Sequence, residues 1–268
     1  MSNTGWNKVE FLDSKDLGKY SWHQGYFKHE WNPKLWKRNF RELKLRDVSL
    51  FPLGEIAGKK ILDIGCGAEG LYMLTFLKMG ASYVAGQDIL TASVKTSIAL
   101  CTENGFNCDA KVGDCTHLAF EDNTFDYVFS GDVFEHITEE QKNKCLAEIY
   151  RVLKPGGLVT IKTPNRSYLK ASIFLKRISA VLKFKNPFTI HIAHTKNNPD
   201  NEHHGLTTHH DLRNLFLENM FHEPTTTFYK LERTGISEWV STRFEKNLYF
   251  NEHIIMTAKK PIFYGLYK

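Results

Sequence analysis

The sequence predicts an α/β fold in which helices cover both faces of a parallel sheet. Short apolar segments alternate with amphipathic ones between about residues 55 and 165, and this alternation is typical of parallel strands joined by helical crossovers. Several of the apolar segments end in an acidic residue. Because ligands of such sheets bind at the carboxyl ends of the strands, these acids mark the expected site. The length of 268 residues fits one such domain with a lid or an insertion.

The first predicted strand and the loop after it are the most informative segment. Residues 61–70 read Ile-Leu-Asp-Ile-Gly-Cys-Gly-Ala-Glu-Gly, and a helical pattern follows over 71–79. The Gly-x-Gly-x-x-Gly spacing alone also fits a dinucleotide site. However, Asp63 and Glu69 would repel a diphosphate, whereas they suit a cationic ligand such as S-adenosylmethionine, which carries a sulfonium and an ammonium. For Glu69, compensation of the helix dipole is the alternative interpretation.

Four further segments read as strands and extend the same pattern. They cover residues 83–88, 111–115, 125–130 and 158–162. The first ends in Asp88, at the offset expected for a carboxylate that accepts both ribose hydroxyls, and the second contains Asp114 near its end. Residues 153–157, Leu-Lys-Pro-Gly-Gly, predict a turn before the last of these strands.

Helices are predicted between the strands and after them. Residues 91–104 have a helical pattern, and a capping box at 138–141 begins a helix that ends near residue 153. A second capping box at 208–211 begins a helix that ends at about Met220. Two more strands are expected near the end of the chain, at 224–231 and 253–259.

Residues 166–206 read as a lid-like insertion after the fifth strand. Its segment 166–185 holds six basic residues and no acidic one. One helical face of this segment carries Phe174, Leu175, Ile178, Val181 and Leu182, with Lys176 and Lys183 opposite. We expect this face to pack on the core and cover the site. Contact with a membrane surface and binding of a phosphorylated substrate are the alternatives.

The ordered motifs resemble those of one enzyme family. After Ile-Leu-Asp-Ile-Gly-Cys-Gly come Gly-Gln-Asp at 86–88, Gly-Asp-Cys at 113–115, Phe-Asp-Tyr-Val at 125–128, Phe-Glu-His-Ile at 134–137 and Leu-Lys-Pro-Gly-Gly at 153–157. Over about residues 55–165 this series resembles class I S-adenosylmethionine-dependent methyltransferases, and within them the small-molecule branch with quinone-biosynthesis and sugar O-methyltransferases. The resemblance implies a Rossmann-like, doubly wound, mostly parallel seven-stranded sheet with an antiparallel C-terminal strand.

The resemblance also implies which residues bind the cofactor, S-adenosylmethionine, whose product is S-adenosylhomocysteine. Asp63, Gly65 and Gly67 would line the methionine part, Asp88 would hold the ribose, and Asp114 with Cys115 would meet the adenine. The same site is expected to include Cys66, Ile89, Ser130 and Gly131.

Four histidines are candidates for the general base that a hydroxyl acceptor would benefit from. His203 and His204 precede the second capped helix, where the resembling family commonly places a histidine near the substrate. His136 follows the fourth strand, with a loop-fixing hydrogen bond as the alternative role, and His23 lies in an aromatic-rich N-terminal segment.

A metal site is not predicted, although the chain is rich in histidine. His191, His194 and the 203–204 pair, together with Asp200 or Glu202, match no firm ligand spacing. A polar loop explains them as well.

Residues 1–54 are expected to form an aromatic-rich helical lid, and 55–268 the methyltransferase domain. Four of the five tryptophans, Trp6, Trp22, Trp31 and Trp36, lie in the first segment. Its expected role is a lid over the site; for the tryptophans, a wall of the substrate site and a cover for the edge of the sheet are the alternatives. The sequence does not indicate an oligomeric state.

The expected acceptor is a small molecule methylated at a hydroxyl oxygen. The net charge of +5 suits an anionic metabolite but is too small to argue for nucleic acid. Residues 130–133 read Ser-Gly-Asp-Val, where amino-directed DNA enzymes of this fold carry a proline-rich run, and no proline precedes a cysteine. We therefore expect no nucleic-acid partner; N-methylation of a small molecule and RNA methylation remain the alternatives.

The cysteines and the N-terminus predict a cytoplasmic protein. The five cysteines are scattered and include no Cys-x-x-Cys pair, which indicates reduced thiols. The first residues, Met-Ser-Asn-Thr-Gly-Trp-Asn, show no apolar signal core.

Overall fold

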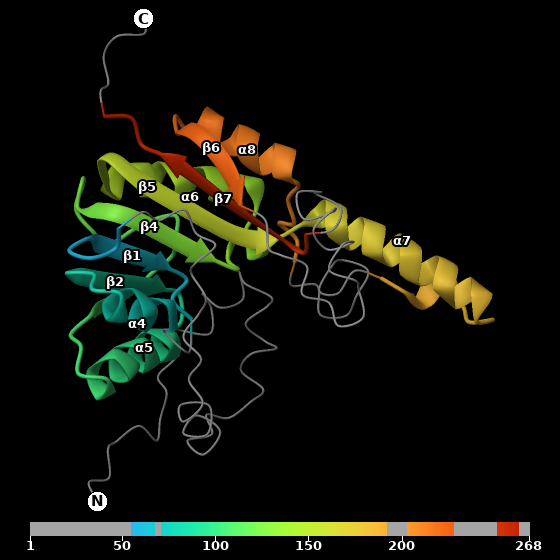
Figure 1. The fold of residues 1–268 in the computed structure, drawn as a ribbon, viewed down its shortest axis with the longest axis horizontal. Coiled ribbons are helices and arrows are strands. Elements are labelled where there is room, and N and C mark those ends of the chain that lie inside the picture. Colours follow the sequence, from blue (N-terminus) through green and yellow to red (C-terminus); the bar gives the residue numbers. More distant parts are fainter. Residues whose placement is uncertain (1–54, 68–70, 192–202, 228–250, 263–268) are drawn as a thin grey trace, which may run out of the picture.

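The computed structural model describes residues 55–67, 71–191, 203–227 and 251–262. The predicted lid over residues 1–54 lies outside these ranges. Within them, one seven-stranded sheet has the order β3-β2-β1-β4-β5-β7-β6 (Figure 1). The strands are β1 (Lys60–Ile64), β2 (Tyr83–Asp88), β3 (Asp109–Val112), β4 (Phe125–Gly131), β5 (Leu153–Pro164), β6 (His222–Thr227) and β7 (His253–Lys259). The described helices are α4 (Leu71–Lys78), α5 (Thr91–Glu103), α6 (Glu139–Val152), α7 (Arg166–Leu182) and α8 (His209–Glu218), with single turns η1 (Phe134–His136) and η2 (Pro187–Thr189).

The pairing of the strands confirms the predicted Rossmann-like, doubly wound topology. β1 pairs in parallel with both β2 and β4, and β4 pairs in parallel with β5. The chain runs outward from β1 to the edge strand β3 and then returns to β4, so the order reverses between β1 and β4. Strand β7 is antiparallel to both of its neighbours, β5 and β6. The topological switch point, where ligands of such sheets bind, therefore lies at the carboxyl ends of β1 and β4.

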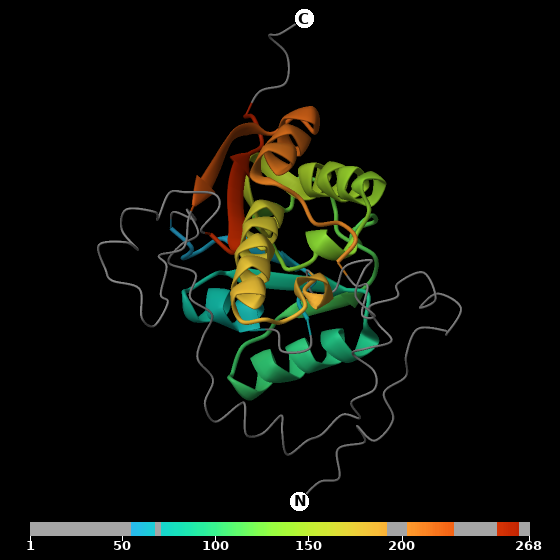
Figure 2. The same ribbon diagram turned by 90° about the vertical axis from the view of Figure 1, so that its right-hand side faces the viewer.

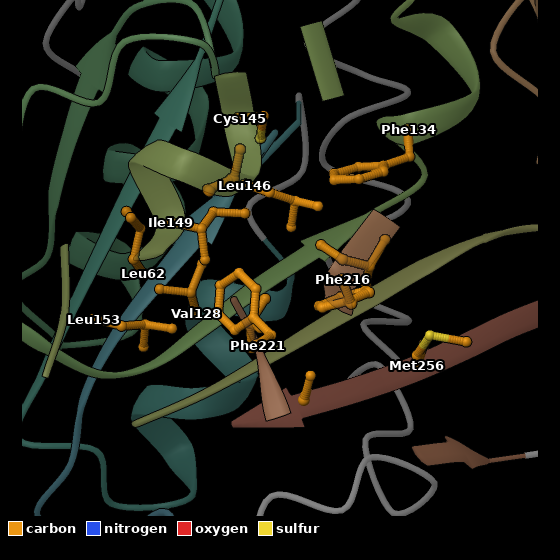
Figure 3. Close-up of a cluster of buried hydrophobic side chains, with 14 of the residues drawn as sticks. Leu62, Val128, Phe134, Cys145, Leu146, Ile149, Leu153, Phe216, Phe221 and Met256 are labelled. Atoms are coloured by element: carbon orange, nitrogen blue, oxygen red, sulfur yellow. The ribbon is translucent and has the colours of Figure 1, made fainter. Parts of the chain in front are cut away.

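Alternating side chains of the central strands supply two separate cores. Leu62 and Val128 belong to a cluster with residues of α6 and α8, whereas the adjacent Ile61 and Tyr127 pack with residues of α4 and α5. Successive side chains of a strand point to opposite faces, so each central strand contributes to both layers. Figure 2 shows the two pairs of helices on opposite sides of the sheet, and Figure 3 shows part of the first cluster.

Both predicted capping boxes are confirmed. Thr138 accepts a hydrogen bond from the backbone N–H of Gln141, whose side chain accepts one from the N–H of Thr138, and α6 begins there. Thr208 and Asp211 form the same reciprocal pair at the start of α8. Satisfying the free N–H groups of the first turn fixes where each helix begins.

The turn predicted at 153–157 is instead the beginning of β5. Phe125 pairs with Leu153 and Tyr127 pairs with Leu158, so the register shifts across this segment. The side chain of Lys154 donates to the Asp126 carboxylate at 2.8 Å, and this carboxylate also accepts from the backbone N–H of Lys60. These contacts keep the glycine-containing segment against β4, so it forms an irregularity within the strand.

The expectation that the apolar face of α7 packs on the core is wrong for the described part of the chain. Phe174, Leu175 and Leu182 are more than half exposed, and so is Val181. The helix begins at the end of β5 and projects away from the sheet (Figure 1), so the core lies beyond its reach. Its buried side chains are Tyr168 and Ala180.

None of the helices that the structure describes is both long enough and apolar enough to cross a membrane.

Candidate functional site

Asp63 lies at the carboxyl end of β1 with its carboxylate buried and unpaired. The residue is 1% exposed, and neither of its side-chain oxygens has a hydrogen-bond partner among the described residues. Burial, and then the negative charge of Asp88, raise the pKa of Asp63 to about 8. A buried carboxylate without a partner is costly. A cationic group bound beside Asp63 would remove that cost.

The glycine loop after β1 has a backbone conformation that requires its glycines. Gly65 and Gly67 have φ values of +71° and +68°, a region that side chains disfavour. A Cβ on Gly65 would also collide with Cγ2 of Val133. The N–H of Gly67 donates to the Asp88 carboxylate at 2.9 Å, so the loop is fixed to the end of β2.

The carboxylate of Asp88 is held in one orientation by backbone donors. Its Oδ1 accepts from the N–H of Leu90 at 2.8 Å, and its Oδ2 accepts from Gly67. Burial raises the pKa of Asp88, and these hydrogen bonds, with one from Ser93, partly oppose the rise. A carboxylate offers about four acceptor sites, and the bonds from Gly67, Leu90 and Ser93 use three of them, so one acceptor site remains for the ribose hydroxyls expected here. Ile89 is half-buried directly after it.

Gln87 holds the loop that carries Asp114 and Cys115, a role that was not predicted from the sequence. Its side-chain amide donates to the carbonyl oxygens of Asp114 and His117 at 2.8 and 3.0 Å, and its oxygen accepts from the N–H of Ala119. The signal was a polar amide between Gly86 and Asp88 in an otherwise buried strand. The Asp114 carboxylate accepts from the N–H of Thr116, and Cys115 is half-buried.

The remaining predicted cofactor residues lie at the same edge of the sheet. Ser130 is buried, its hydroxyl has no hydrogen-bond partner within the described ranges, and its backbone pairs with that of Ile64, next to Gly65. Gly131 ends β4. Cys66 is buried between the two acids, and burial is the main reason that its pKa is raised. The structure therefore brings Asp63, Cys66, Asp88 and the glycines together, while Gln87 connects Asp114 to them.

Two of the four predicted catalytic histidines meet beyond the end of β4. The rings of His136 and His203 lie edge to face, with their centroids 4.9 Å apart. His204 is on the surface, where partial burial and the charge of Lys142 lower its pKa. His23 lies outside the described residues.

Glu135 completes this cluster, and its role was not predicted. It is 2% exposed, and its carboxylate accepts a hydrogen bond from the hydroxyl of Thr163 at 2.9 Å. Burial, and then the charge of Asp132, raise the pKa of Glu135 to about 8. The residue falls inside the Phe-Glu-His-Ile motif, but its partner Thr163 is 28 positions away, so no local pattern indicates the contact.

Ligand atoms of Glu135, His136 and His203 lie within 4.8 Å of one another. Carboxylate and imidazole groups are donor types that bind divalent metals. This group of possible metal ligands differs from the set that the sequence suggested, with which it shares only His203. Of that earlier set, His191 is exposed, and His194, Asp200 and Glu202 lie outside the described residues.

Several contacts hold the segment that carries His203. The fully buried ammonium of Lys142 donates to the carbonyl oxygen of Gly205 at 2.6 Å, and the N–H of Gly205 donates to the carbonyl of Glu135 at 2.8 Å. A bridge joins Asn165 to Thr207. These bonds connect the segment to α6, to η1 and to the end of β5, so they fix His203 beside His136.

The fold and the site together define a class of protein. A glycine loop at the switch point, a buried unpaired carboxylate and a ribose-type carboxylate at the next strand end fit a nucleoside cofactor with a positive charge. This is the combination expected for an S-adenosylmethionine-dependent methyltransferase domain.

Comparison with known proteins agrees with that class. Residues 62–161 match the model of the methyltransferase domain family. The chain is 30% identical over 148 residues to the ubiquinone biosynthesis O-methyltransferase of Bartonella bacilliformis, which is 54% of this chain and 58% of that protein. It is 34% identical over 131 residues to phosphoethanolamine N-methyltransferase 3 of Arabidopsis thaliana, 45% of this chain and 25% of that protein. The matches thus span less than two thirds of these relatives.

A solved structure shows the same fold over most of the chain. A SAM-dependent methyltransferase from Methanosarcina mazei superposes with a TM-score of 0.57 at 20% identity, covering 82% of this chain and all of that one. This likeness shows that the two chains share a fold.

Proposed function

We propose that this protein transfers a methyl group from S-adenosylmethionine to a hydroxyl oxygen of a small molecule. The observation that carries the proposal is the His136–His203 pair, which lies beyond the end of β4, next to the cofactor-binding edge. When bound, the cofactor supplies a methyl group on a sulfonium, which is an excellent leaving group. The protein then has two tasks, alignment of the acceptor and removal of its proton.

The residues at the ends of β1 and β2 would hold the cofactor. Asp63 would partner a cationic group, because its carboxylate is buried and the part of the chain that the structure describes supplies no partner for it. Asp88 would accept the ribose hydroxyls in the orientation that Gly67 and Leu90 fix. Such rigid placement aligns the methyl group of the cofactor with its acceptor, since hydrogen-bonding groups that are already fixed need no reorganisation when the substrate binds.

The histidine pair would receive the proton of the acceptor hydroxyl. A neutral imidazole nitrogen is a suitable base near pH 7, and a positioned base contributes roughly 10²–10⁴-fold to rate. A quinone-like phenol, a sugar hydroxyl and a phosphorylated metabolite all fit this chemistry, and the net charge of +5 suits an anionic acceptor. The similarity to a ubiquinone biosynthesis O-methyltransferase supports the phenol.

N-methylation of a small amine is the second candidate. The similarity to a phosphoethanolamine N-methyltransferase favours it. An amine whose lone pair is free needs no base, so the two candidates differ in their dependence on the histidines.

Turnover of a dihydroxylated benzoate and of phosphoethanolamine, measured for four histidine variants, tests the proposal. We expect methylation of the phenol, and we expect His203→Ala or His136→Ala to lower kcat by roughly 10²-fold or more with unchanged cofactor affinity. His204→Ala tests His204, the third candidate for the general base. His210→Ala, on the exposed start of α8, is the matched control and should turn over normally. Methylation of the amine alone, at full rate in every variant, would reject the hydroxyl acceptor.

We also propose a reducing compartment, the cytoplasm, as the place of action. All five cysteines are free thiols. Cys101 hydrogen-bonds to Cys108, and Cys145 hydrogen-bonds to Cys115. Thiols this close stay unbridged in a cytoplasm because glutathione and thioredoxin keep them reduced.

A further inference from the structure

The exposed apolar side chains of this protein are concentrated on one projecting element. Seven of the twelve large apolar side chains exposed in the described ranges fall between residues 174 and 188. Five of them form the outward face of α7, and the other two, Phe184 and Phe188, lie in the connection after it. Leu182 is 75% exposed and Phe184 is fully exposed. Single exposed apolar side chains are ordinary, whereas a contiguous group of this kind marks an interaction surface.

The charges around this face have one sign. Residues 166–185 include Arg166, Lys170, Lys176, Arg177, Lys183 and Lys185, and no acidic residue. At 100° per residue, Lys176 and Lys183 lie on the side of the helix opposite Phe174. Arg177 donates to the carbonyl oxygen of Ile190, so it also holds the following segment against the helix. A surface of this composition attracts a partner that is both apolar and anionic.

The position of α7 leaves this face accessible to a large flat partner. The helix leaves the end of β5 and extends away from the sheet in Figure 1, and it points toward the viewer in Figure 2. The helix contacts η2, and the five side chains of its apolar face stay exposed. The apolar face is therefore not needed to hold the described part of the helix in place.

We propose that α7 and the following turn bind the surface of a membrane that contains anionic lipids. The helix would lie in the plane of the interface, with Phe174, Leu175, Ile178, Val181 and Leu182 among the acyl chains and the basic residues among the headgroups. A protein partner of the same chemistry would need an acidic apolar groove. A bilayer offers both properties over the whole length of the helix, so the charge pattern favours it. The inference does not depend on the proposed function.

Co-sedimentation of the full chain with vesicles tests the proposal directly. The vesicles contain either phosphatidylglycerol with phosphatidylcholine or phosphatidylcholine alone. We expect binding to the first, weakened by salt, because basic residues near an anionic surface contribute roughly fivefold each. The double variant Leu175→Ser/Leu182→Ser should lose at least about tenfold in binding. The control variant Met79→Ser/Leu217→Ser removes two exposed apolar side chains outside α7 and should bind as the parent does.

Further measurements test the contribution of the basic residues and the other possible occupants of the apolar face. Lys176→Gln/Lys183→Gln should reduce the preference for anionic vesicles, with the same cofactor affinity and melting temperature. A parent chain that stays in the supernatant with anionic vesicles overturns the proposal. So does binding that appears only when residues 1–54 are removed, because the face then belongs to that segment. Light scattering tests a second copy as the occupant. If the parent is a dimer, Leu175→Ser/Leu182→Ser is a monomer and neither binds vesicles, the face is a dimer interface and the proposal is overturned.

Discussion

Asp63 lowers the stability of the ligand-free protein at neutral and alkaline pH. Its carboxyl group is buried at the end of β1, no described residue hydrogen-bonds to it, and its pKa is raised from 3.8 to about 8. The unfolded chain loses this proton near pH 4, whereas the folded chain keeps it until about pH 8. Folding therefore takes up a proton between these values, and the contribution of Asp63 to stability falls as the pH rises through that window. A cationic ligand that stabilises the ionised form would reverse the cost.

The substitution Asp63→Asn should raise the stability of the ligand-free protein and weaken cofactor binding. Asparagine keeps the shape but does not ionise, so the melting temperature of the variant relative to the parent should increase between pH 5 and 8. A gain of about 3 °C at pH 8 corresponds to roughly 1 kcal/mol in a domain of this size. Differential scanning fluorimetry across this range measures it.

Calorimetry provides the second half of this test. The parent should bind S-adenosylmethionine more tightly as the pH rises from 6 to 8, because binding favours the ionised carboxylate, and Asp63→Asn should bind weakly at every pH. If the variant is the less stable protein at pH 8 and binds the cofactor normally, Asp63 has a structural role alone.

The sequence predicted the polar residues that follow a local rule and missed those that depend on distant partners. Asp63 interrupts an apolar strand, which is visible in the chain itself. Gln87 contacts a loop about 30 positions away, and Glu135 bonds to Thr163 on another strand. Such contacts require the order of the strands, which side-chain periodicity does not supply.

Within α6, two Lys–Glu pairs of similar geometry have different environments. Lys142 pairs with Glu139 at 2.6 Å and is fully buried, whereas Lys144 pairs with Glu140 at 2.7 Å and is exposed. Lys142 also donates to Gly205, so it connects the helix to the segment that carries His203. Loss of a buried donor leaves a buried acceptor unpaired, but loss of an exposed one is repaired by water.

The pair Lys142→Met and Lys144→Met tests whether α6 positions the histidine segment. We expect Lys142→Met to lower the free energy of unfolding by about 1–3 kcal/mol and to lower kcat, with cofactor affinity preserved. Lys144→Met should leave the melting temperature and kcat unchanged. Equal kcat in the two variants at a temperature where both are folded would show that Lys142 is structural alone.

Helix and strand boundaries were predictable where the signal is local. Both capping boxes begin helices at the expected residues because their hydrogen bonds join residues three positions apart. The segment 153–157 has turn residues but pairs with β4, since Lys154 reaches Asp126 across the sheet. The periodicity of α7 gave the apolar face correctly. What covers that face depends on the direction of the helix relative to the sheet, and no local sequence pattern predicts this direction.

At the scale of the molecule, the last described strand completes the sheet. β7 comes from residues 253–259, yet it lies between β5 and β6 and pairs with both. Five consecutive residues of it, 254–258, are buried, and they contribute to the cores on both faces. The resemblance to a family predicted an antiparallel strand here, whereas the alternation of strands and helices earlier in the chain does not predict one.

A chain that stops after Glu252 should therefore fail to fold, although the cofactor-binding residues are all present in it. Burial of Ile254, Ile255 and Met256 contributes roughly 1.5–3 kcal/mol each, which is comparable to the whole stability of a typical domain, about 5–15 kcal/mol. Its removal would also leave β5 and β6 with unpaired edges, and exposed edges favour aggregation. A chain that stops after Ile262 keeps every described element and is the matched control. The soluble fraction and the cooperativity of thermal unfolding measure the difference. A soluble, cooperatively melting chain without β7 that still binds the methyl donor would show that the five parallel strands and their helices are sufficient for the fold.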